Sequence, residues 1–197
     1  MKVPVVPGLS RNEIEAKAVS LLRECDPEGL NGKCPVDVEA IFEIYIPERF
    51  GIQTGYADLS FLGDGVLGYT NAARKVSYVD KTLIDSDHPP TRRRCRSTVG
   101  HESGHCLYHV SILNFFRSSS FKDEGYRLYR AERSEVKAYE NPEWQAWEFA
   151  RACLMPRQLI LKYCKKGYSQ ADMAERFDVN PIFLEVRLNT LKIKGPF

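Results

Sequence analysis

The segment STVGHESGHCLYH at residues 97–109 constrains this chain more than any other part of its sequence, because it holds three of the four histidines around one glutamate. If the segment is helical, His101 and His105 lie on one face, about 6 Å apart along the axis. Two imidazoles placed in this way can bind one cation, usually zinc. Glu102 follows the first histidine, where a general base can take a proton from a water molecule beside the metal. The pattern predicts a metal site on a helix, although an amphipathic helix with two surface histidines has the same spacing.

The third histidine of the segment, His109, is not expected to bind the same ion. On a straight helix it lies about 12 Å from His101, whereas the ligands of one zinc ion all lie within about 2 Å of it. We therefore expect His109 to pack against the site or to support a ligand. Among the carboxylates, Glu143 in the first turn of a predicted helix is the best candidate for the missing ligand, with Glu140 and Glu148 as alternatives.

The composition predicts a soluble protein with no global attraction to nucleic acid or lipid. The 197 residues are 43% hydrophobic, which suffices for one compact domain, and the net charge is only +2. No apolar run approaches the roughly 18 residues that span a bilayer, and residues 1–15 lack the hydrophobic segment of a secretory signal. Six scattered cysteines without a CxxC pair indicate reduced thiols, with a Cys25–Cys34 bridge or a thiolate metal ligand as the alternatives. A cytoplasmic location follows as an expectation.

The first half of the chain predicts helices followed by a small sheet. Residues 11–24 and 35–45 carry apolar side chains near helical spacing. Residues 51–84 form short, glycine-bounded segments that are rich in β-branched and aromatic residues, so two or three antiparallel strands are expected there.

The second half predicts mainly helices. A long helix is expected at about 93–114, followed by a polar excursion at residues 115–140. Asn141 is expected to cap a helix that ends before Pro156. The remaining residues, 157–197, predict several short helices.

Two separated motifs give the chain its resemblance to a known family. RSTVGHESGHCLYH at 96–109 and EWQAWEFARACLMP at 143–156 resemble the ImmA/IrrE family of metallopeptidases. The hallmark of that family is a pattern like R-F-T-L-A-H-E-L-G-H-x-x-x-H, followed by E-x-Q-A-N-x-F-A-x-x-L-L-M-P. PVDVEAIFE at 35–43 and ADMAERFDVNPIFLEVRLNTL at 171–191 are similar to further segments of the family. The resemblance thus covers most of the chain.

The resemblance implies a fold and a domain organisation. The fold would be α+β and zincin-like, with a small antiparallel sheet packed beside the HExxH helix and a helical C-terminal tail. We expect a metallopeptidase core at residues 1–156 and a helix-turn-helix-like subdomain at residues 157–197, packed on that core.

The resemblance also implies an activity. It points to a zinc endopeptidase in which His101, His105 and Glu143 hold the metal and Glu102 is the catalytic acid/base. Mn²⁺ and Fe²⁺ suit the same ligands. Relatives in this family act in the cytosol on helix-turn-helix repressors or antitoxin-like regulators during stress or mobile-element transfer, so the expected partner is such a protein.

Some residues depart from the family pattern. Ser97 and Ser103 stand where large apolar residues are usual, and Trp147 replaces an asparagine. The basic cluster at residues 92–96 is outside the signature.

The group that stabilises the oxyanion is not identified by these motifs. Tyr139, His88 and Arg151 are the candidates, and each is equally consistent with a surface or packing residue. The substrate is expected to extend along an edge strand, for which residues 75–82 are the candidate.

Two other classes of function are open from the sequence. The C-terminal segment resembles a helix-turn-helix, but its prospective recognition helix at 181–194 begins with apolar residues, which argues against the reading of base edges. The basic cluster at residues 92–96 is equally a solvated helix start. The other alternative is a non-catalytic zinc-containing regulator that works by association. No membrane partner is expected.

Overall fold

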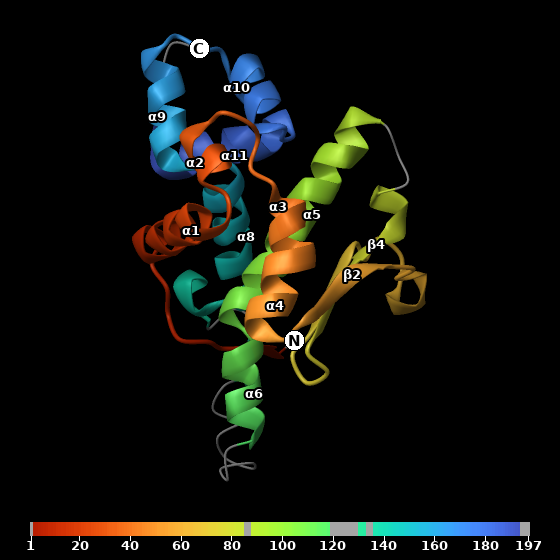
Figure 1. The fold of residues 1–197 in the computed structure, drawn as a ribbon. Helices are drawn as coiled ribbons and strands as arrows, with labels where there is room; N and C mark the ends of the chain where they lie inside the picture. The colour runs from red at the N-terminus through yellow and green to blue at the C-terminus, as the bar shows by residue number, and fades with distance from the viewer. Residues whose placement is uncertain (1, 85–87, 119–129, 133–135, 194–197) are drawn as a thin grey trace.

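The computed structural model describes residues 2–84, 88–118, 130–132 and 136–193, which form a mainly helical body with a small sheet on one side (Figure 1). The strands are β1 (Lys2–Pro4), β2 (Gln53–Ala57), β3 (Gly68–Asn71), β4 (Val76–Asp80) and β5 (Arg130–Glu132). The helices are α1 (Arg11–Cys25), α2 (Pro27–Asn31), α3 (Val38–Ala40), α4 (Ile46–Phe50), α5 (Pro89–Tyr108), α6 (Val110–Ser118), α8 (Pro142–Leu154), α9 (Arg157–Lys165), α10 (Gln170–Phe177) and α11 (Pro181–Leu191). A π-helical turn, η1 (Ile41–Tyr45), and three 3₁₀ turns, η2 (Ser60–Leu62), η3 (Lys81–Leu83) and η4 (Ala138–Glu140), complete the described elements.

Helix α5 is the centre of this arrangement. It contacts β3 and β4 on one side and α8 on the other (Figure 1). Pro89 and Pro90 occupy its first turn, where the missing backbone N–H costs nothing because these groups have no partner within a helix. The helix ends at Tyr108, and α6 continues from Val110. The single helix predicted over residues 93–114 is therefore divided at His109.

The sheet is mixed, which corrects the prediction of antiparallel strands. Its order is β2-β4-β3, with β3 antiparallel and β2 parallel to β4. A tight turn, in which Lys75 has a φ of 52°, joins β3 to β4 as an antiparallel hairpin. Residues 58–67 before that hairpin are long enough to carry the chain across the sheet, so β2 pairs with β4 in the parallel direction.

The strand order also corrects the predicted substrate strand. Residues 75–82 contain β4, which lies in the middle of the sheet with both edges paired. The edge strands of this sheet are β2 and β3. Of these two, β3 faces the HExxH segment of α5, as the site geometry below shows.

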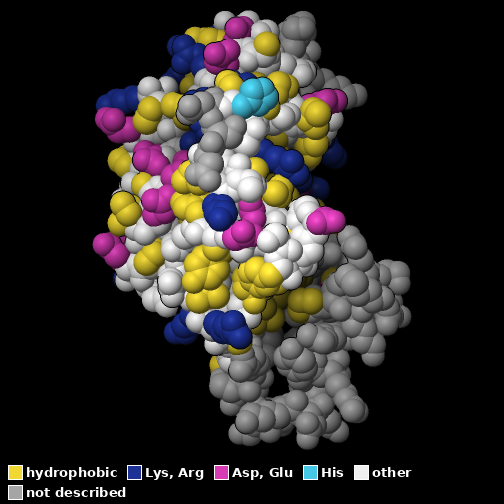
Figure 2. Space-filling view, turned by 90° about the vertical axis from the view of Figure 1, so that its right-hand side faces the viewer, with side chains coloured by type: hydrophobic (Ala, Val, Ile, Leu, Met, Phe, Trp, Pro, Cys, Tyr) yellow, Lys and Arg dark blue, Asp and Glu magenta, His cyan; other side chains and the backbone are white. Residues whose placement is uncertain are grey.

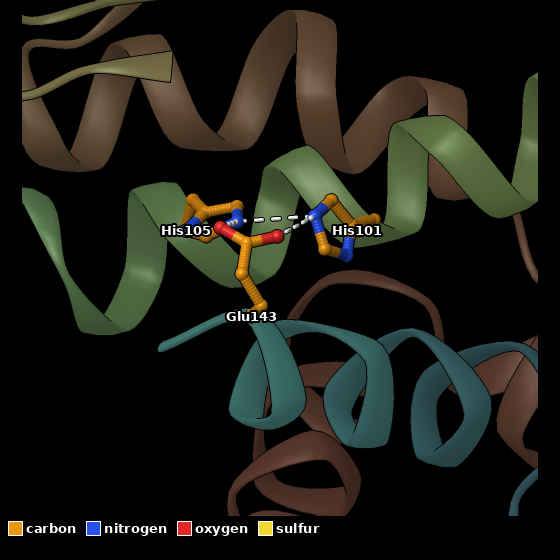
Figure 3. A group of neighbouring side chains, drawn as sticks. All are labelled: His101, His105 and Glu143. Carbon is orange, nitrogen blue, oxygen red and sulfur yellow. Dashed lines mark hydrogen bonds and ion pairs between the residues drawn. The ribbon is translucent and has the colours of Figure 1, made fainter. Parts of the chain in front are cut away.

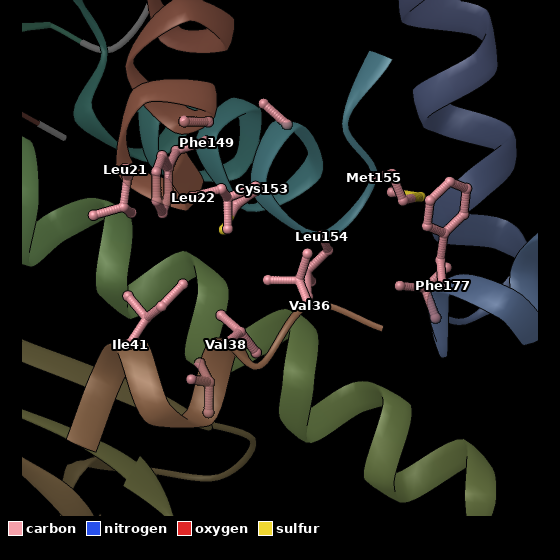
Figure 4. Close-up of a cluster of buried hydrophobic side chains, with 14 of the residues drawn as sticks. Leu21, Leu22, Val36, Val38, Ile41, Phe149, Cys153, Leu154, Met155 and Phe177 are labelled. Atoms are coloured by element: carbon pink, nitrogen blue, oxygen red, sulfur yellow. The ribbon is translucent and has the colours of Figure 1, made fainter. Parts of the chain in front are cut away.

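One hydrophobic cluster connects the first helix with the last. Figure 4 shows its middle, where side chains of α1, of the segment from Val36 to Ile41, and of α8 meet. Met155 and Phe177 continue the cluster towards α10, and Leu188 of α11 belongs to it as well. The boundary between residues 156 and 157 stays a prediction, but the helices beyond it share the core of the preceding ones.

The basic cluster at the start of α5 contacts the protein itself. Arg92 and Arg93 bind Asp178 Oδ1 at 2.7 and 3.1 Å, and Arg96 donates from Nε to the carbonyl oxygen of Asp178 at 3.1 Å. Burial alone would raise the pKa of Asp178, but these hydrogen bonds and the nearby positive charges together lower it below its ordinary value. Asp178 follows α10 in the left-handed conformation, with a φ of 50°. The three arginines therefore hold the turn between α10 and α11 against α5.

The structure also bears on other predictions. The six cysteines are free, so the alternative bridge between Cys25 and Cys34 is not formed. Of the polar excursion at 115–140, residues 119–129 and 133–135 lie outside the described residues. The short antiparallel pair of β1 and β5, which joins that region to the N-terminus, was not predicted. In the described part of the chain, no helix has the length and apolar character needed to cross a membrane.

Candidate metal centre

Close packing between α5 and α8 brings the second motif to the first. A Cβ atom on Gly104 would lie 2.9 Å from the Cα of Ala146, so the two helix backbones are nearly in contact there. One turn away, Gly100 faces Ala150 with more space, since its Cβ would lie 3.3 Å from the Ala150 Cβ. Glu143 is three residues before Ala146, so this approach carries it to the HExxH face of α5.

The side chains of His101, His105 and Glu143 converge on one point (Figure 3). The two Nε2 atoms are 3.0 Å apart, and each lies 3.3 Å from one carboxylate oxygen of Glu143. Ligands about 2.0–2.1 Å from a tetrahedral zinc ion lie about 3.3 Å from one another. The spacing of the three donor atoms therefore fits the donor set of a small divalent cation.

The position of Glu143 follows from its helix start. Asn141 caps α8 by accepting from the backbone N–H of Glu143 at 2.9 Å, and the Glu143 side chain remains 65% exposed. Hydrogen bonds with His101 and His105 hold the pKa of Glu143 well below its usual range. Burial alone would lower the pKa of His105, but Glu143 and the negative charge of Glu102 raise it above its ordinary value.

The alternative carboxylates, Glu148 and Glu140, do not belong to the group of described residues that could hold one metal ion. Glu148 is buried and binds Arg151 at 3.2 Å, with Arg11 also 3.5 Å away. Glu140 ends the η4 turn, and its carbonyl oxygen accepts from the backbone N–H of Val6. Among the described residues, the group that could hold one metal ion contains a single carboxylate, that of Glu143, beside the two histidines.

His109 supports His105 through a chain of hydrogen bonds. Its Nδ1 lies 2.9 Å from His105 Nδ1, and its Nε2 lies 3.1 Å from Gln145 Oε1. If His105 offers the lone pair of Nε2 to a metal, its proton is on Nδ1 and His109 accepts it, which leaves the His109 proton on Nε2 for Gln145. Gln145 in turn donates to the carbonyl oxygens of Pro7 and Tyr139. Burial and the nearby His105 lower the pKa of His109 to about 3, so it stays neutral.

His101 is supported differently. Its ring lies against Trp147, with ring centroids 4.2 Å apart, and its buried Nδ1 has no hydrogen-bond partner among the described protein atoms. Trp147 also contacts the ring of Phe183 on α11, at 6.1 Å between centroids. An aromatic surface rather than an acceptor therefore fixes this histidine.

Glu102 is held by the edge strand β3. It is 5% exposed, and its Oε2 accepts from Thr70 Oγ1 at 2.5 Å. A Cβ on Gly68 would lie 2.2 Å from Oε1 of Glu102, so only glycine permits this approach. Burial is the main cause that raises the pKa of Glu102, against the opposing effects of His105 and His101. Sequence reasoning missed Thr70 and Gly68, because neither has a spacing signal relative to HExxH.

Comparison with known protein families identifies the family of this chain. The sequence model described as the IrrE N-terminal-like domain, a peptidase family, matches residues 47–189. The chain belongs to this family. The resemblance drawn from the two motifs is thereby confirmed, and the matched segment contains the whole set of candidate ligands.

A solved structure shares the fold of this IrrE-like chain. A transcriptional regulator of Mycobacterium tuberculosis superposes with a TM-score of 0.56 at 17% sequence identity. The match covers 92% of this chain and 47% of the regulator, so the chain spans less than half of the length of that protein. The expected α+β fold is confirmed. A search of curated protein sequences gives no match.

The candidate metal centre opens into a cavity of about 920 Å³ that extends towards α11. His88 and Arg151, two of the candidates for oxyanion stabilisation, line this cavity. Tyr139 does not: its side chain lines a separate hollow of about 350 Å³ together with Arg11 and Trp144. Tyr139 reaches the site only through its carbonyl oxygen, which accepts from Gln145.

Proposed function

We propose that this IrrE-like protein is a zinc-dependent endopeptidase that cleaves a cytosolic protein. The observation that carries the proposal is the convergence of His101, His105 and Glu143 beside the carboxylate of Glu102. Two imidazoles and one carboxylate are the donor set of a catalytic zinc site that keeps a position open for water or substrate. Membership of a peptidase family supports the same chemistry. Mn²⁺ and Fe²⁺ are the alternative ions for these ligands.

The chain's own residues supply the remaining parts of the reaction. When bound, the metal would act as a Lewis acid that makes water more acidic and polarises the peptide carbonyl. Glu102 would accept the proton of the attacking water and pass it to the leaving amine. Thr70 would orient Glu102 by donating to Oε2, so that Oε1 is left for the water. His109 and Gln145 would hold the proton of His105 on Nδ1.

The edge strand β3 is the proposed place for the substrate backbone. Among the described strands β3 pairs only with β4, so its other edge can pair with an extended peptide. A hollow of about 220 Å³ lies between Gly68–Thr70 and the candidate ligands. A peptide added to this edge would therefore lie beside both Glu102 and the metal.

A regulatory protein is the proposed substrate, specifically a helix-turn-helix repressor or an antitoxin-like protein in the cytoplasm. The structurally similar protein is described as a transcriptional regulator, which supports a role in the control of gene expression. The share of that protein that the chain spans, 47%, leaves room in it for further domains. The proposed setting is a stress response or the transfer of a mobile element.

The observations favour this function over direct DNA binding. The first turns of α11, which a helix-turn-helix protein would present to DNA, line the cavity with Ile182, Phe183 and Val186. Three of the four arginines in the basic cluster of α5, Arg92, Arg93 and Arg96, bind Asp178. Among the described residues, acidic and basic side chains are interspersed on the face that carries the sheet (Figure 2), which argues against a single-sign patch for phosphates on that part of the surface.

The test uses wild-type protein and the Glu102→Gln variant, each reconstituted with zinc. The substrates are purified repressors and antitoxins whose genes neighbour the gene of this protein. Their cleavage is followed by mass spectrometry. We expect the wild-type protein to cut at least one of them at a defined bond. Glu102→Gln should bind zinc with the same stoichiometry and leave the substrate intact, because the ligands are unchanged and only the base is lost.

Two results would contradict the proposal. Equal cleavage by the wild-type and the Glu102→Gln protein would remove the assigned role of Glu102. Tight binding of a regulator without cleavage by either form would instead support the non-catalytic, zinc-containing regulator that the sequence left open.

A further inference from the structure

The cavity at the metal centre has an apolar wall that the reaction itself does not need. This wall consists of Trp147 from α8 and of Ile182, Phe183 and Val186 from α11. Trp147 and Phe183 meet edge to face, and both are only partly buried. Ile182 is 70% exposed and Val186 is 39% exposed. A cluster of large apolar side chains open to solvent is a common mark of a binding surface.

The position of this wall is fixed by buried polar contacts. Arg187, in the middle of α11, is 2% exposed and donates to the carbonyl oxygen of Met155 and to the carboxylate of Glu15. Asp178 ties the turn before α11 to the arginines at the start of α5. Helix α11 is thus attached to α5, to the end of α8 and to α1, so its apolar face is held at the cavity.

The cavity is also electrostatically asymmetric. Its acidic lining residues, Glu102 and Glu143, both belong to the metal centre. Of its two arginines, Arg151 binds Glu148, whereas the exposed Arg94 forms no ion pair with any described residue. The end of the cavity away from the metal therefore carries a positive charge with no acidic partner in the described part of the chain.

Ser97 leaves space in the cavity between Arg94 and the metal ligands. It lines the cavity about two turns after the start of α5, and its hydroxyl donates to the carbonyl oxygen of Arg94 at 2.9 Å. A large side chain at this position would project into the cavity between Arg94 and the metal ligands.

We propose that this wall is a specificity site for the substrate. It would bind an extended segment that places a large aliphatic or aromatic side chain against Trp147 and Phe183 and an acidic side chain near Arg94. The inference rests on the proposed function for its location at the metal, because a peptide paired with β3 passes Gly68, which lines the same cavity. In an extended peptide alternate side chains point to the same side, so both contacts can be made from one face of the segment.

The first experiment measures binding without turnover. The probes are ten-residue peptides with one para-nitrophenylalanine, a quencher of tryptophan fluorescence, and either glutamate or lysine one to four residues away. They are titrated into the full-length, zinc-loaded Glu102→Gln protein. We expect quenching by the glutamate peptides, and loss of that quenching in a further Trp147→Phe variant that retains Trp144 as its only tryptophan.

The variants separate the two contacts. Ile182→Asp should weaken binding about tenfold, because it puts a charge into the apolar contact. Arg94→Glu should reverse the preference for glutamate over lysine, and Ser97→Leu should block binding. Ile44→Asp and Arg49→Glu are the matched controls, because both side chains are exposed and neither lines the cavity. These controls should bind as tightly as the parent protein.

The second experiment repeats the substitutions with Glu102 intact and measures the rate of peptide cleavage. If the wild-type protein cleaves the peptides, and Ile182→Asp and Arg94→Glu change neither the cleavage rate nor the affinity, the specificity site is overturned and the peptidase function stands. Preferential binding of the glutamate peptides that depends on Ile182 and Arg94, without cleavage by the wild-type protein, would support the site and overturn the peptidase function. Absence of both quenching and cleavage would overturn both.

Discussion

Replacement of Gly104 by alanine tests the packing that brings the two motifs together. The new Cβ would lie 2.9 Å from the Ala146 Cα and 3.1 Å from its carbonyl oxygen. Backbone atoms cannot rotate away, so α8 must move by about 0.5 Å or more to restore ordinary contact. Gly100→Ala is the matched control on the same helix, because its Cβ would lie 3.3 Å from the Ala150 Cβ and 3.4 Å from the Ala150 Cα, which is close to ordinary contact.

Both substitutions should stabilise the helix, but they should differ in how much overpacking they cause. Alanine in place of glycine stabilises a helix by about 1 kcal/mol at either position. Overpacking costs about 1–3 kcal/mol, and we expect it mainly at Gly104. Gly104→Ala should therefore be about 1–2 kcal/mol less stable than Gly100→Ala. Because metal–ligand distances tolerate only about 0.2 Å, displacement of Glu143 should also weaken zinc binding about tenfold or more.

The assay combines denaturant unfolding of the metal-free proteins with competition between each protein and a chromogenic chelator for zinc. Gly100→Ala should match the wild-type protein in zinc affinity. If Gly104→Ala also binds zinc as tightly as the wild-type protein and is as stable as Gly100→Ala, then helix contact at this position does not place Glu143, and the reasoning is refuted.

Three further predictions concern other parts of the site and fold. His109→Leu should weaken zinc binding by about tenfold to a hundredfold in the same chelator assay, because it leaves the buried Nδ1–H of His105 without an acceptor; unchanged affinity would exclude the supporting role. Gly68→Ala should abolish peptide cleavage yet retain zinc, since it displaces the carboxylate of Glu102; full activity would show that β3 does not position this group. Asp178→Asn, which tolerates the left-handed backbone, should lose about 2 kcal/mol of unfolding free energy at pH 7. Because the folded pKa of Asp178 is lowered, this difference should persist above about pH 4 and disappear as the pH falls through the folded pKa; a constant difference from pH 7 to pH 2 would contradict it.

The local part of the site was predictable because it depends on helix periodicity. The spacing of His101 and His105 fixes their common face in any α-helix, and the same geometry excludes His109 as a ligand of the same ion. Asn141 and the proline after it defined the start of α8 by ordinary capping rules. The choice of Glu143 over its neighbours depended on the family resemblance, because no local rule says which carboxylate of α8 faces α5.

The long-range parts were less predictable. Strand order depends on how residues 58–67 cross the sheet, and the sequence contains no periodic signal for that path. The contact of Thr70 with Glu102 joins residues 32 positions apart, and it follows from that strand order. The basic cluster of α5 gave no indication that its partner was Asp178, because a carboxylate after a distant short helix has the same local pattern as any surface acid.

The most direct test of the central claim is the zinc content of the purified protein and of its Glu143→Ala variant after dialysis against a weak chelator. Glu140→Ala is the matched control, because Glu140 precedes the same helix and does not belong to the candidate ligand set. We predict one equivalent of zinc in the wild-type protein and in Glu140→Ala, and loss of most of it in Glu143→Ala. Equal zinc content in all three proteins would contradict a site built from His101, His105 and Glu143.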